Sequence, residues 1–548
     1  MKIHLQIWLW IAVALSGVLP MSAYDFQTDG IYYGLNGEEA TVVQGDTPYS
    51  GDVVVPSSVS YDGNTYSVTA IGETAFESCS ELISIALPNT VTTIGYAAFY
   101  NCSSLASVSM GNSVTSIGVH AFFLCSSLAS ITLPASVTSI ETDAFLSCAN
   151  LEEIIVAEGN NSYSSVDGVL YDKNKTTLLK CPDKKSQVTI PTSVTAIENG
   201  AFTGCHGLTT IEIPNSVKSI SSQAFFSCRN LTTVSIGNSV TAIGNGAFSN
   251  CTSLEGIVVS EENPSYSSVE GALYNKDQTV LSKWPDKKLN VSIPNSVTAI
   301  GNCAFEYCSE LTSITLPESV TTIGEWAFSR CSGLTSIDIP HAVKNIGYQA
   351  FSYCDNLTSI SIGNSVIVIG DYAFENCNRL TLVAMGNSVS AIGNYAFSGC
   401  SSLPSITLPA SVTRIGANAF WGCNNLQKIY SWPQNPPEIA FNTFSIDHYT
   451  SSTLYIPTGC KSKYEANPNW YNFMNMVEIQ SSVDEIDRQE LHIYVVDCTL
   501  HVENDGAAYR VYSASGKAVY AGNVATLSLA PGVYVVCTEN DVQKVLVK

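Results

Sequence analysis

Charge is scarce in this sequence, and positive charge is the scarcer sign. Only 13% of the 548 residues are charged, and 24 Lys and Arg stand against 47 Asp and Glu, for a formal net charge of −23. Proteins that bind nucleic acids depend on clustered Lys and Arg to neutralise phosphates. We therefore expect no nucleic-acid partner, and a surface covered mainly by uncharged Ser, Thr and Asn.

Motifs that support catalysis are missing as well. The seven His residues are scattered, with no HExxH and no other metal-ligand spacing. No EF-hand loop, GxSxG string or phosphate-binding loop is present. We predict a protein that is not an enzyme and that carries no cofactor and no metal.

Long hydrophobic runs are absent except at the N-terminus. Lys2 precedes an apolar stretch from Ile7 to Leu19, and the small residues Ser22 and Ala23 follow it. This order is typical of an export signal, so we predict a signal peptide over residues 1–23. An uncleaved membrane anchor is the alternative, although the stretch is shorter than the ~20 residues that a span needs. After signal removal we expect no transmembrane span.

The sequence is instead rich in one repeated string, AFxxCxxL. It occurs thirteen times between Ala75 and Leu426, and nearly every copy follows the last by 23 residues. A unit of this length cannot bury an apolar face alone, so neighbouring units must stack and share a continuous core. The period therefore predicts a solenoid. The expected core residues are Phe76, Phe99, Phe122, Phe145, Phe202, Phe225, Phe248, Phe305, Phe328, Phe351, Phe374, Phe397 and Phe420.

Each unit is expected to contain two short strands and a return turn. In the copy from Ser127 to Cys148, Ile131 and Leu133 alternate with polar residues, which is the period of a half-buried strand. Val137 and Ile140 belong to the second strand, and a Pro or Gly marks the bend between the two. The AF segment then forms the return turn. The predicted fold class is mainly β.

The cysteines allow three interpretations. Thirteen of the 18 lie at one register, from Cys79 to Cys423. That register points into the core beside Phe and Leu, so we favour buried free thiols. Disulfides are the alternative, because an exported protein meets oxidising conditions and neighbouring strands lie only ~4.8 Å apart; metal ligation is the third. Cys498 and Cys537 could pair in the C-terminal segment.

Copies such as SVTTIGEWAFSRCSGLTSIDIP resemble the BspA-type leucine-rich repeat of bacterial surface proteins, over about residues 67–430. We expect an exported protein that is associated with the outer membrane at the cell surface, or extracellular. The resemblance implies host matrix proteins or other cells as partners. Two interruptions of the period, near residues 157–190 and 260–293, resemble the hairpin insertions of this family. Their ends place Lys184, Lys185, Lys287 and Lys288 as basic spots or, as we prefer, as solvated turns.

The flanks of the repeats are expected to cover the ends of the solenoid. Residues 24–66 predict an N-terminal β cap, and residues 431–479 predict an irregular C-terminal cap. Residues 480–548 alternate apolar and polar residues as a small β-sandwich does. This segment resembles the C-terminal sorting domains of type IX secretion, which implies the secretion machinery as a partner. A plain β-sandwich accessory domain is the alternative.

Two surfaces are candidates for binding. Outward Ser and Thr on the first strand of each unit form a hydroxyl-covered sheet, which exposed strands also favour structurally. Aromatic residues beside the repeat Phe are the sharper candidate, because exposed rings anchor protein partners or stack on sugars. Packing between neighbouring turns is their alternative role. These residues are Trp326, Tyr372 and Tyr395 two positions before the Phe, Tyr307 and Tyr353 two positions after it, and Trp421 directly after it.

We therefore predict an adhesion or recognition protein that binds extracellular host or cell-surface proteins over an extended repeat face. A glycan-binding surface protein and a structural scaffold without a dedicated ligand are the alternatives.

Overall fold

The computed structural model describes residues 24–479 and the backbone of seven later strands between residues 492 and 547. The chain divides into two compact units. One contains the residues up to 454 together with 464–475, and the other contains 455–463 and 476–548. The predicted signal peptide lies outside the described residues. Within the described part of the chain, no helix is long and apolar enough to cross a membrane.

The N-terminal strands continue directly into the repeats. An antiparallel meander leads to β3, and β3 pairs in parallel with β6, which in turn pairs with the first repeat strand β8. The sheet edge of the first coil is therefore covered by strands that are not repeats. These strands are β1 (Phe26–Thr28), β2 (Ile31–Asn36), β3 (Glu39–Val42), β5 (Ser58–Tyr61) and β6 (Asn64–Ile71).

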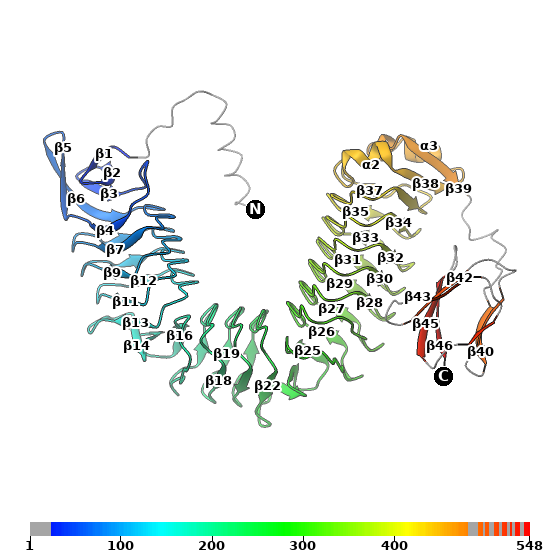
Figure 1. Ribbon diagram of the computed structural model, residues 1–548, viewed down its shortest axis with the longest axis horizontal. Coiled ribbons are helices and arrows are strands. Elements are labelled where there is room, and N and C mark those ends of the chain that lie inside the picture. Colours follow the sequence, from blue (N-terminus) through cyan, green and yellow to red (C-terminus); the bar gives the residue numbers. More distant parts are fainter. Residues whose placement is uncertain are drawn as a thin grey trace. The chain divides into compact units, whose positions relative to one another are not determined.

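Most coils add one strand to each of two parallel ladders, and the first ladder is divided into several short sheets (Figure 1). The coil that follows Phe305 contributes only an isolated bridge to the first ladder, between Ser313 and Ser336. Paired residues stand 23 positions apart, as in Ile131 with Ile154 or Ile346 with Ile369. The first ladder contains β4 (Gly51–Val54), β7 (Leu82–Ala86), β9 (Ser107–Ser109), β11 (Ser130–Leu133), β13 (Glu153–Val156), β18 (Thr210–Ile213), β20 (Thr233–Ile236), β22 (Gly256–Val259), β28 (Ser336–Asp338), β30 (Ser359–Ser361), β32 (Leu382–Ala384), β34 (Ser405–Leu408) and β36 (Lys428–Ser431). The second contains β8 (Thr93–Ile94), β10 (Ser116–Ile117), β12 (Ser139–Ile140), β17 (Ala196–Ile197), β19 (Ser219–Ile220), β21 (Ala242–Ile243), β26 (Ala299–Ile300), β27 (Thr322–Ile323), β29 (Asn345–Ile346), β31 (Val368–Ile369), β33 (Ala391–Ile392), β35 (Arg414–Ile415) and β37 (Glu438–Ile439).

The repeat Phe side chains form the centre of the core. All thirteen are at most 3% exposed. Within an uninterrupted run of coils their rings stack on one another, with centroids 4.5 to 5.6 Å apart and planes within 17°. Because each coil presents the same ring to its neighbour, the core continues from coil to coil without a change of packing.

The cysteines of the repeat register are buried free thiols, and they do more than fill space. Ten of the thirteen thiols donate to the carbonyl oxygen of the repeat Phe one coil earlier, as in Cys354 Sγ to Phe328 O at 3.2 Å. Burial raises the pKa of Cys102, Cys148 and Cys423 to about 12, so these thiols keep the proton that they donate. The row is therefore a ladder of S–H···O contacts between coils.

Each insertion of the repeat region folds as three strands rather than as a single hairpin. The third strand of each pairs in parallel with the next coil, so it takes the place of a second-ladder strand. The repeat Phe stack is interrupted here, because the insertion stands between Phe145 and Phe202 and again between Phe248 and Phe305. The strands are β14 (Tyr163–Val166), β15 (Val169–Asp172) and β16 (Thr177–Lys180), then β23 (Tyr266–Val269), β24 (Ala272–Asn275) and β25 (Val280–Lys283).

The last coil is covered by an aromatic cluster. The Phe444 ring stacks on Phe420 at 5.1 Å and so extends the repeat stack by one ring. Trp470 is fully buried, and its indole N–H donates to the Pro437 carbonyl at 2.8 Å. The short helices here are α2 (Ile446–Ser451), α3 (Lys461–Glu465) and the 3₁₀ turn η1 (Trp470–Asn472).

The second unit contains β39 (Asn475–Ile479), most of β38 (Thr453–Pro457) and seven antiparallel strands in two sheets. One sheet consists of β40 (His492–Val496), β41 (Thr499–Glu503) and β44 (Thr526–Ser528); the other consists of β43 (Ala518–Gly522), β42 (Tyr509–Ser513), β45 (Gly532–Cys537) and β46 (Val542–Val547). The β-sandwich and its sorting role stay predictions. Cys498 lies outside the described residues, so the pairing of Cys498 with Cys537 stays a prediction too.

Candidate functional site

The return turns place two residues per coil in the left-handed region of backbone conformation. They stand two positions before and two positions after the repeat Phe. Trp326 and Tyr395 have φ of 53° and 55° at the first position, and Tyr353 has φ of 58° at the second. This conformation lets the backbone N–H point along the stack: Trp326 N–H donates to the Tyr348 carbonyl of the next coil at 2.9 Å. Bulky side chains are uncommon in this region, and here their backbone is held by the neighbouring coil.

Four aromatic rings of successive coils touch in a row, which we call the aromatic ladder: Trp326, Tyr348, Tyr372 and Tyr395. The Trp326 and Tyr348 rings meet edge to face at 5.1 Å, and Tyr348 meets Tyr372 in the same way at 5.6 Å. Tyr372 and Tyr395 stack at 4.7 Å with planes 3° apart. The sequence-based candidates Trp326, Tyr372 and Tyr395 therefore come together, and each is half-buried.

Acidic and amide groups border the aromatic ladder. Burial, aided by the charges of Glu375, Asp371 and Glu325, raises the pKa of Tyr348. Burial also raises the pKa of Glu375. The Trp326 indole N–H donates to Gln349 Oε1 at 2.5 Å. The ladder is thus a partly exposed apolar surface within a negatively charged border.

A second aromatic group forms at the position two residues after the repeat Phe. The Arg330 guanidinium lies 5.4 Å from the Tyr307 ring centroid and 4.5 Å from that of Tyr353. Tyr307 also meets Phe226 edge to face at 5.8 Å. The candidates Tyr307 and Tyr353 therefore lie on either side of Arg330. This arrangement favours a role in packing between turns over a role in ligand binding. The remaining candidate, Trp421, is 58% exposed.

Two members of these groups were missed from the sequence. Tyr348 stands three positions before its Phe instead of two, so a search along one register passes over it. Arg330 stands two positions after its repeat Phe, as Tyr307 and Tyr353 do in the units before and after it. Arg330 is not aromatic, so the pattern of aromatic residues alone does not include it.

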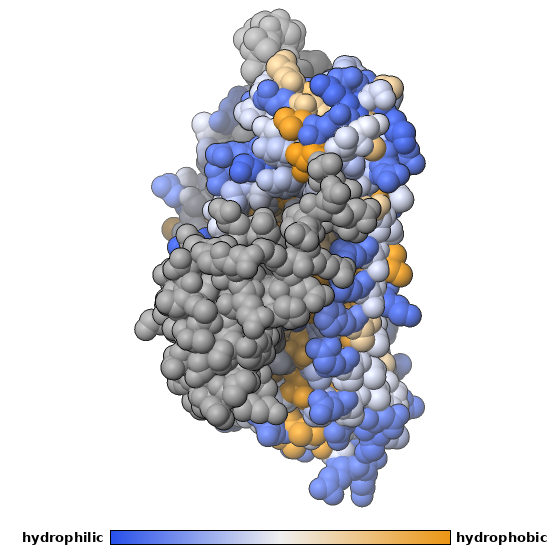
Figure 2. Space-filling model, turned by 90° about the vertical axis from the view of Figure 1, so that its right-hand side faces the viewer, coloured by the Kyte–Doolittle hydropathy of each residue, from blue (hydrophilic) through white to orange (hydrophobic). Residues whose placement is uncertain are grey.

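The hydroxyl-covered sheet has a structural function in part. At its edge, Thr232, Thr335 and Thr358 directly precede first-ladder strands, and each donates a side-chain hydrogen bond to the backbone carbonyl of the equivalent residue one coil earlier. Ser84 donates to Asp52. Figure 2 shows one face of the molecule, on which hydrophilic residues repeat in a column from coil to coil. Polarity is therefore part of how these coils stack, and by itself it does not identify a binding face.

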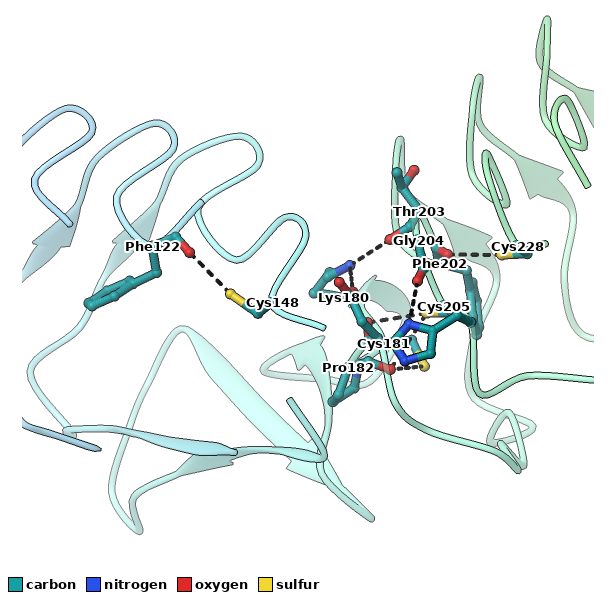
Figure 3. A network of polar contacts seen from close by, with 12 residues as sticks. Phe122, Cys148, Lys180, Cys181, Pro182, Phe202, Thr203, Gly204, Cys205 and Cys228 are labelled. Atoms are coloured by element: carbon teal, nitrogen blue, oxygen red, sulfur yellow. Dashed lines mark hydrogen bonds and ion pairs between the residues drawn. The ribbon is translucent and has the colours of Figure 1, made fainter. Parts of the chain in front are cut away.

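Each insertion contains a buried ion pair that the sequence did not lead us to expect. Lys180 Nζ lies 2.8 Å from Asp183 and donates to the Thr203 carbonyl at 3.0 Å (Figure 3). Lys283 and Asp286 form the equivalent pair at 2.5 Å. Burial lowers the pKa of Lys180, but the Asp183 carboxylate outweighs it and raises that pKa, so the lysine stays charged.

Three of the four lysines at the ends of the insertions form ion pairs at the surface. Lys184 pairs with Glu152 at 2.6 Å, Lys287 with Glu310 at 3.7 Å, and Lys288 with Glu270 at 3.1 Å. These exposed pairs contribute little to stability. In the described part of the chain, no group of three or more His, Cys, Asp or Glu is placed to hold a metal ion.

Comparisons with known proteins identify the repeat region. The model of the BspA type leucine rich repeat region matches residues 63–166, 175–276, 286–401 and 367–491. No curated protein matches.

Several solved structures are similar to this chain. A leucine rich cell surface protein from Faecalibacterium prausnitzii A2-165 is 26% identical, covers 84% of this chain and 98% of its own, and has a TM-score of 0.37. A leucine-rich repeat protein from Bacteroides ovatus ATCC 8483 is also 26% identical, covers 83% and 100%, and has a TM-score of 0.30. The pneumococcal vaccine antigen PcpA is 19% identical, covers 83% and 98%, and has a TM-score of 0.38.

The fold is a mainly-β solenoid of about 23-residue repeats with few helices, as the period predicted. Leucine-rich-repeat proteins are generally non-enzymatic. Since the matched ranges cover well over half of the sequence, the chain belongs to the family of proteins with a BspA-type leucine-rich repeat region.

Proposed function

We propose that this protein is a non-enzymatic recognition protein of the bacterial cell surface, and that it binds extracellular proteins through the aromatic ladder. The observation that supports this proposal is the unbroken row of ring contacts from Trp326 to Tyr395. Trp and Tyr dominate the binding energy of many protein interfaces. Four of them in a row, three half-buried and Tyr348 exposed, offer a ready-made contact surface.

The scaffold favours binding because the rings are ordered before a partner arrives. Each ladder residue sits on a turn whose backbone is hydrogen-bonded to the next coil, as Tyr372 N–H is to the Asn394 carbonyl at 2.8 Å. Ordering side chains on binding costs about 0.5 to 1.5 kcal/mol each, so rings that are already fixed save most of that cost. The acidic border formed by Glu325, Asp371 and Glu375 would favour partners with basic groups.

Export and surface attachment belong to the same proposal. The signal-like residues 1–23 and the sorting-like residues 480–548 would carry the chain through the secretion machinery to the cell surface or the medium. Fractionation of cells that produce the full chain, with and without residues 480–548, would test this part. Retention of the shortened chain inside the cell supports a sorting role, and unchanged export contradicts it.

The binding test compares two triple variants of residues 24–548 on immobilised extracellular matrix proteins. The first replaces Trp326, Tyr372 and Tyr395 by Gly, a residue that already stands at this register as Gly200 and Gly246. The turns therefore stay compatible with Gly. The matched control, Thr74→Gly/Gln223→Gly/Asn418→Gly, changes the same register in coils without the ladder.

The proposal expects saturable binding by the unchanged chain and by the control, and at least tenfold weaker binding by the ladder variant. Equal binding by all three proteins would remove the ladder from the interface.

A glycan ligand is the second candidate. Tyr372 and Tyr395 lie in nearly parallel planes, 3° apart, and could present a flat apolar surface of the kind on which sugar rings stack. The same three proteins applied to a glycan array separate the candidates. Binding to glycans but not to matrix proteins, with loss of glycan binding in the ladder variant, supports the second candidate. Absence of binding to both glycans and matrix proteins supports a structural role.

A further inference from the structure

A cavity opens where the first insertion interrupts the repeat stack. It has a volume of about 340 Å³ and lies between the coil of Phe145, the insertion strands and the coil of Phe202. Its size falls at the lower end of the range for small-molecule sites, which is about 300 to 1,000 Å³. The cavity exists because Phe145 stacks on Phe122 on one side while the insertion separates it from Phe202 on the other.

The cavity has an apolar floor and an acidic rim. The floor consists of Phe145, Leu146, Leu170 and Leu179, and Tyr163 closes one wall. The rim carries three carboxylates, from Glu141, Asp143 and Glu198. Such a lining fits a molecule that is apolar at one end and positively charged at the other.

Two of these carboxylates replace a glycine that the repeat otherwise uses. Ten of the thirteen units have Gly four positions before the repeat Phe, and the exceptions are Glu141, Glu198 and Ser221. Close packing explains the glycine: a Cβ added to Gly118 would lie 2.7 Å from the backbone of Gly95 in the preceding coil. Glutamates occupy this crowded register only in the two coils that form the walls of the cavity.

The second insertion is an internal control for the first. The two align with a constant offset of 103 residues, and Tyr163, Leu170 and Lys180 have identical counterparts in Tyr266, Leu273 and Lys283. All three rim carboxylates correspond to glycines, namely Gly244, Gly246 and Gly301. The same insertion therefore folds without the acidic rim, so stacking and hairpin formation do not require it.

The space itself also differs between the two insertions. Gly200 borders the first cavity, where an added Cβ would lie 3.6 Å from Asp143 Oδ1. Its counterpart is Cys303, which is buried and lies against Gly246. A small residue thus leaves the first cavity open beside its carboxylates, whereas a larger side chain occupies the equivalent position in the second.

The positive groups that face the cavity do not neutralise its rim. Lys180 is held by Asp183 at 2.8 Å and by the Thr203 carbonyl, so its charge is already paired. His120 lies 3.9 Å from Asp143 and carries a charge only when protonated. Glu141 accepts a hydrogen bond from the neutral Ser139 hydroxyl. At neutral pH the rim therefore keeps a net negative charge.

We propose that this cavity is a binding site for a primary alkylammonium group, with Glu141, Asp143 and Glu198 around the cation and the leucines around the alkyl chain. A free alkylamine and a lysine side chain of an extracellular polypeptide share this chemistry. The site is separate from the aromatic ladder and does not depend on it.

Isothermal titration calorimetry on residues 24–548 at pH 8 tests the proposal. The titrants are 1-pentylamine, Nα-acetyl-lysine methylamide and the uncharged 1-pentanol. We expect both amines to bind and pentanol to bind at least tenfold more weakly, with amine binding that weakens as salt is added. Tighter binding of pentylamine assigns the site to free amines, and tighter binding of the lysine derivative assigns it to polypeptide side chains.

The deciding variant is Glu141→Gly/Asp143→Gly/Glu198→Gly, which copies the second insertion. Its matched control, Glu81→Gln/Glu255→Gln/Glu318→Gln, removes three exposed carboxylates elsewhere. The proposal expects amine binding to fall about tenfold or more in the first variant, and to stay within twofold in the control, at an unchanged melting temperature. Absence of amine binding by the unchanged chain, equal binding of pentanol, or an equal loss in the control would overturn it.

Discussion

Replacing Phe328 by Ala measures how much the ring stack contributes to stability. Phe328 is fully buried and lies between two parallel rings, Phe305 at 4.9 Å and Phe351 at 5.0 Å. Loss of a buried Phe costs about 3 to 5 kcal/mol in free energy of unfolding. Each lost ring pair adds about 0.5 to 1.5 kcal/mol beyond burial. We therefore expect a cost near the upper end of the first range.

Phe145→Ala is the matched comparison. Within residues 24–479 its ring stacks only on Phe122, at 5.6 Å, although its side chain is just as buried. Losing one ring pair instead of two should make its cost smaller by about 0.5 to 1.5 kcal/mol.

Hydrogen exchange read out by mass spectrometry is the suitable assay, because opening in a repeat array is local and need not follow a single transition. The amides of the coils around the replaced ring should exchange faster, and the urea midpoint should fall. Unchanged exchange in the Phe328 variant, or an equal effect of the two substitutions, would refute the reasoning that stacked rings couple neighbouring coils.

The remaining predictions concern the turns, the thiols, the buried ion pair and the cap. Tyr372→Gly should be more stable than Tyr372→Ala by about 1 kcal/mol, because both lose the ring but only Ala keeps the cost of φ at 58°; urea titration compares them. Cys331→Ala should cost only about 1 to 2 kcal/mol in the same assay, and reductant should leave the melting temperature of the unchanged chain where it is, unlike the loss of a disulfide. Lys283→Ala should cost about 3 to 5 kcal/mol because it leaves Asp286 buried without its counterion, and Lys283→Met/Asp286→Leu should recover most of that loss in thermal unfolding. Burial lowers the pKa of His448 in the folded chain, so as the pH drops this histidine is protonated in the unfolded chain before it is protonated in the folded chain. The free energy of unfolding should therefore decrease as the pH drops below about 6.5. His448→Gln should flatten that decline between pH 7.5 and 5.5, and an equal decline would contradict the assignment.

The repeat core was predictable because one period fixed every inward position at once. The Phe, Cys and Leu represented by Phe328, Cys331 and Leu334 recur at the same offsets in every unit, and stacking of the units buries them in the shared core. The role of the thiol was less visible. It depends on a Phe carbonyl that the return turn leaves within reach, and the path of that turn is not encoded in the hydrophobic pattern.

The candidate site was predictable only for residues at one position of the repeat. Trp326, Tyr372 and Tyr395 all stand two positions before the repeat Phe, so the sequence pattern identifies them together. Tyr348 stands three positions before its Phe, and only the structure shows that its ring contacts those of Trp326 and Tyr372. The buried Lys180 was beyond sequence reasoning for another reason. A lysine beside Pro182 and Asp183 suggests a solvated turn, and only the packing of the insertion against the next coil buries it.

The interruption of the ring stack has a consequence for how such a gene can change. Inside an uninterrupted run, such as Phe305 to Phe420, removal or duplication of one 23-residue unit brings an identical ring onto an identical ring and joins strands in the same register. Recombination between the similar coding segments there would yield a longer or shorter protein that still folds. A crossover that removed an insertion would also delete its ion pair and the cavity wall beside it. We therefore expect the number of repeat units to vary more readily during evolution than the number of insertions.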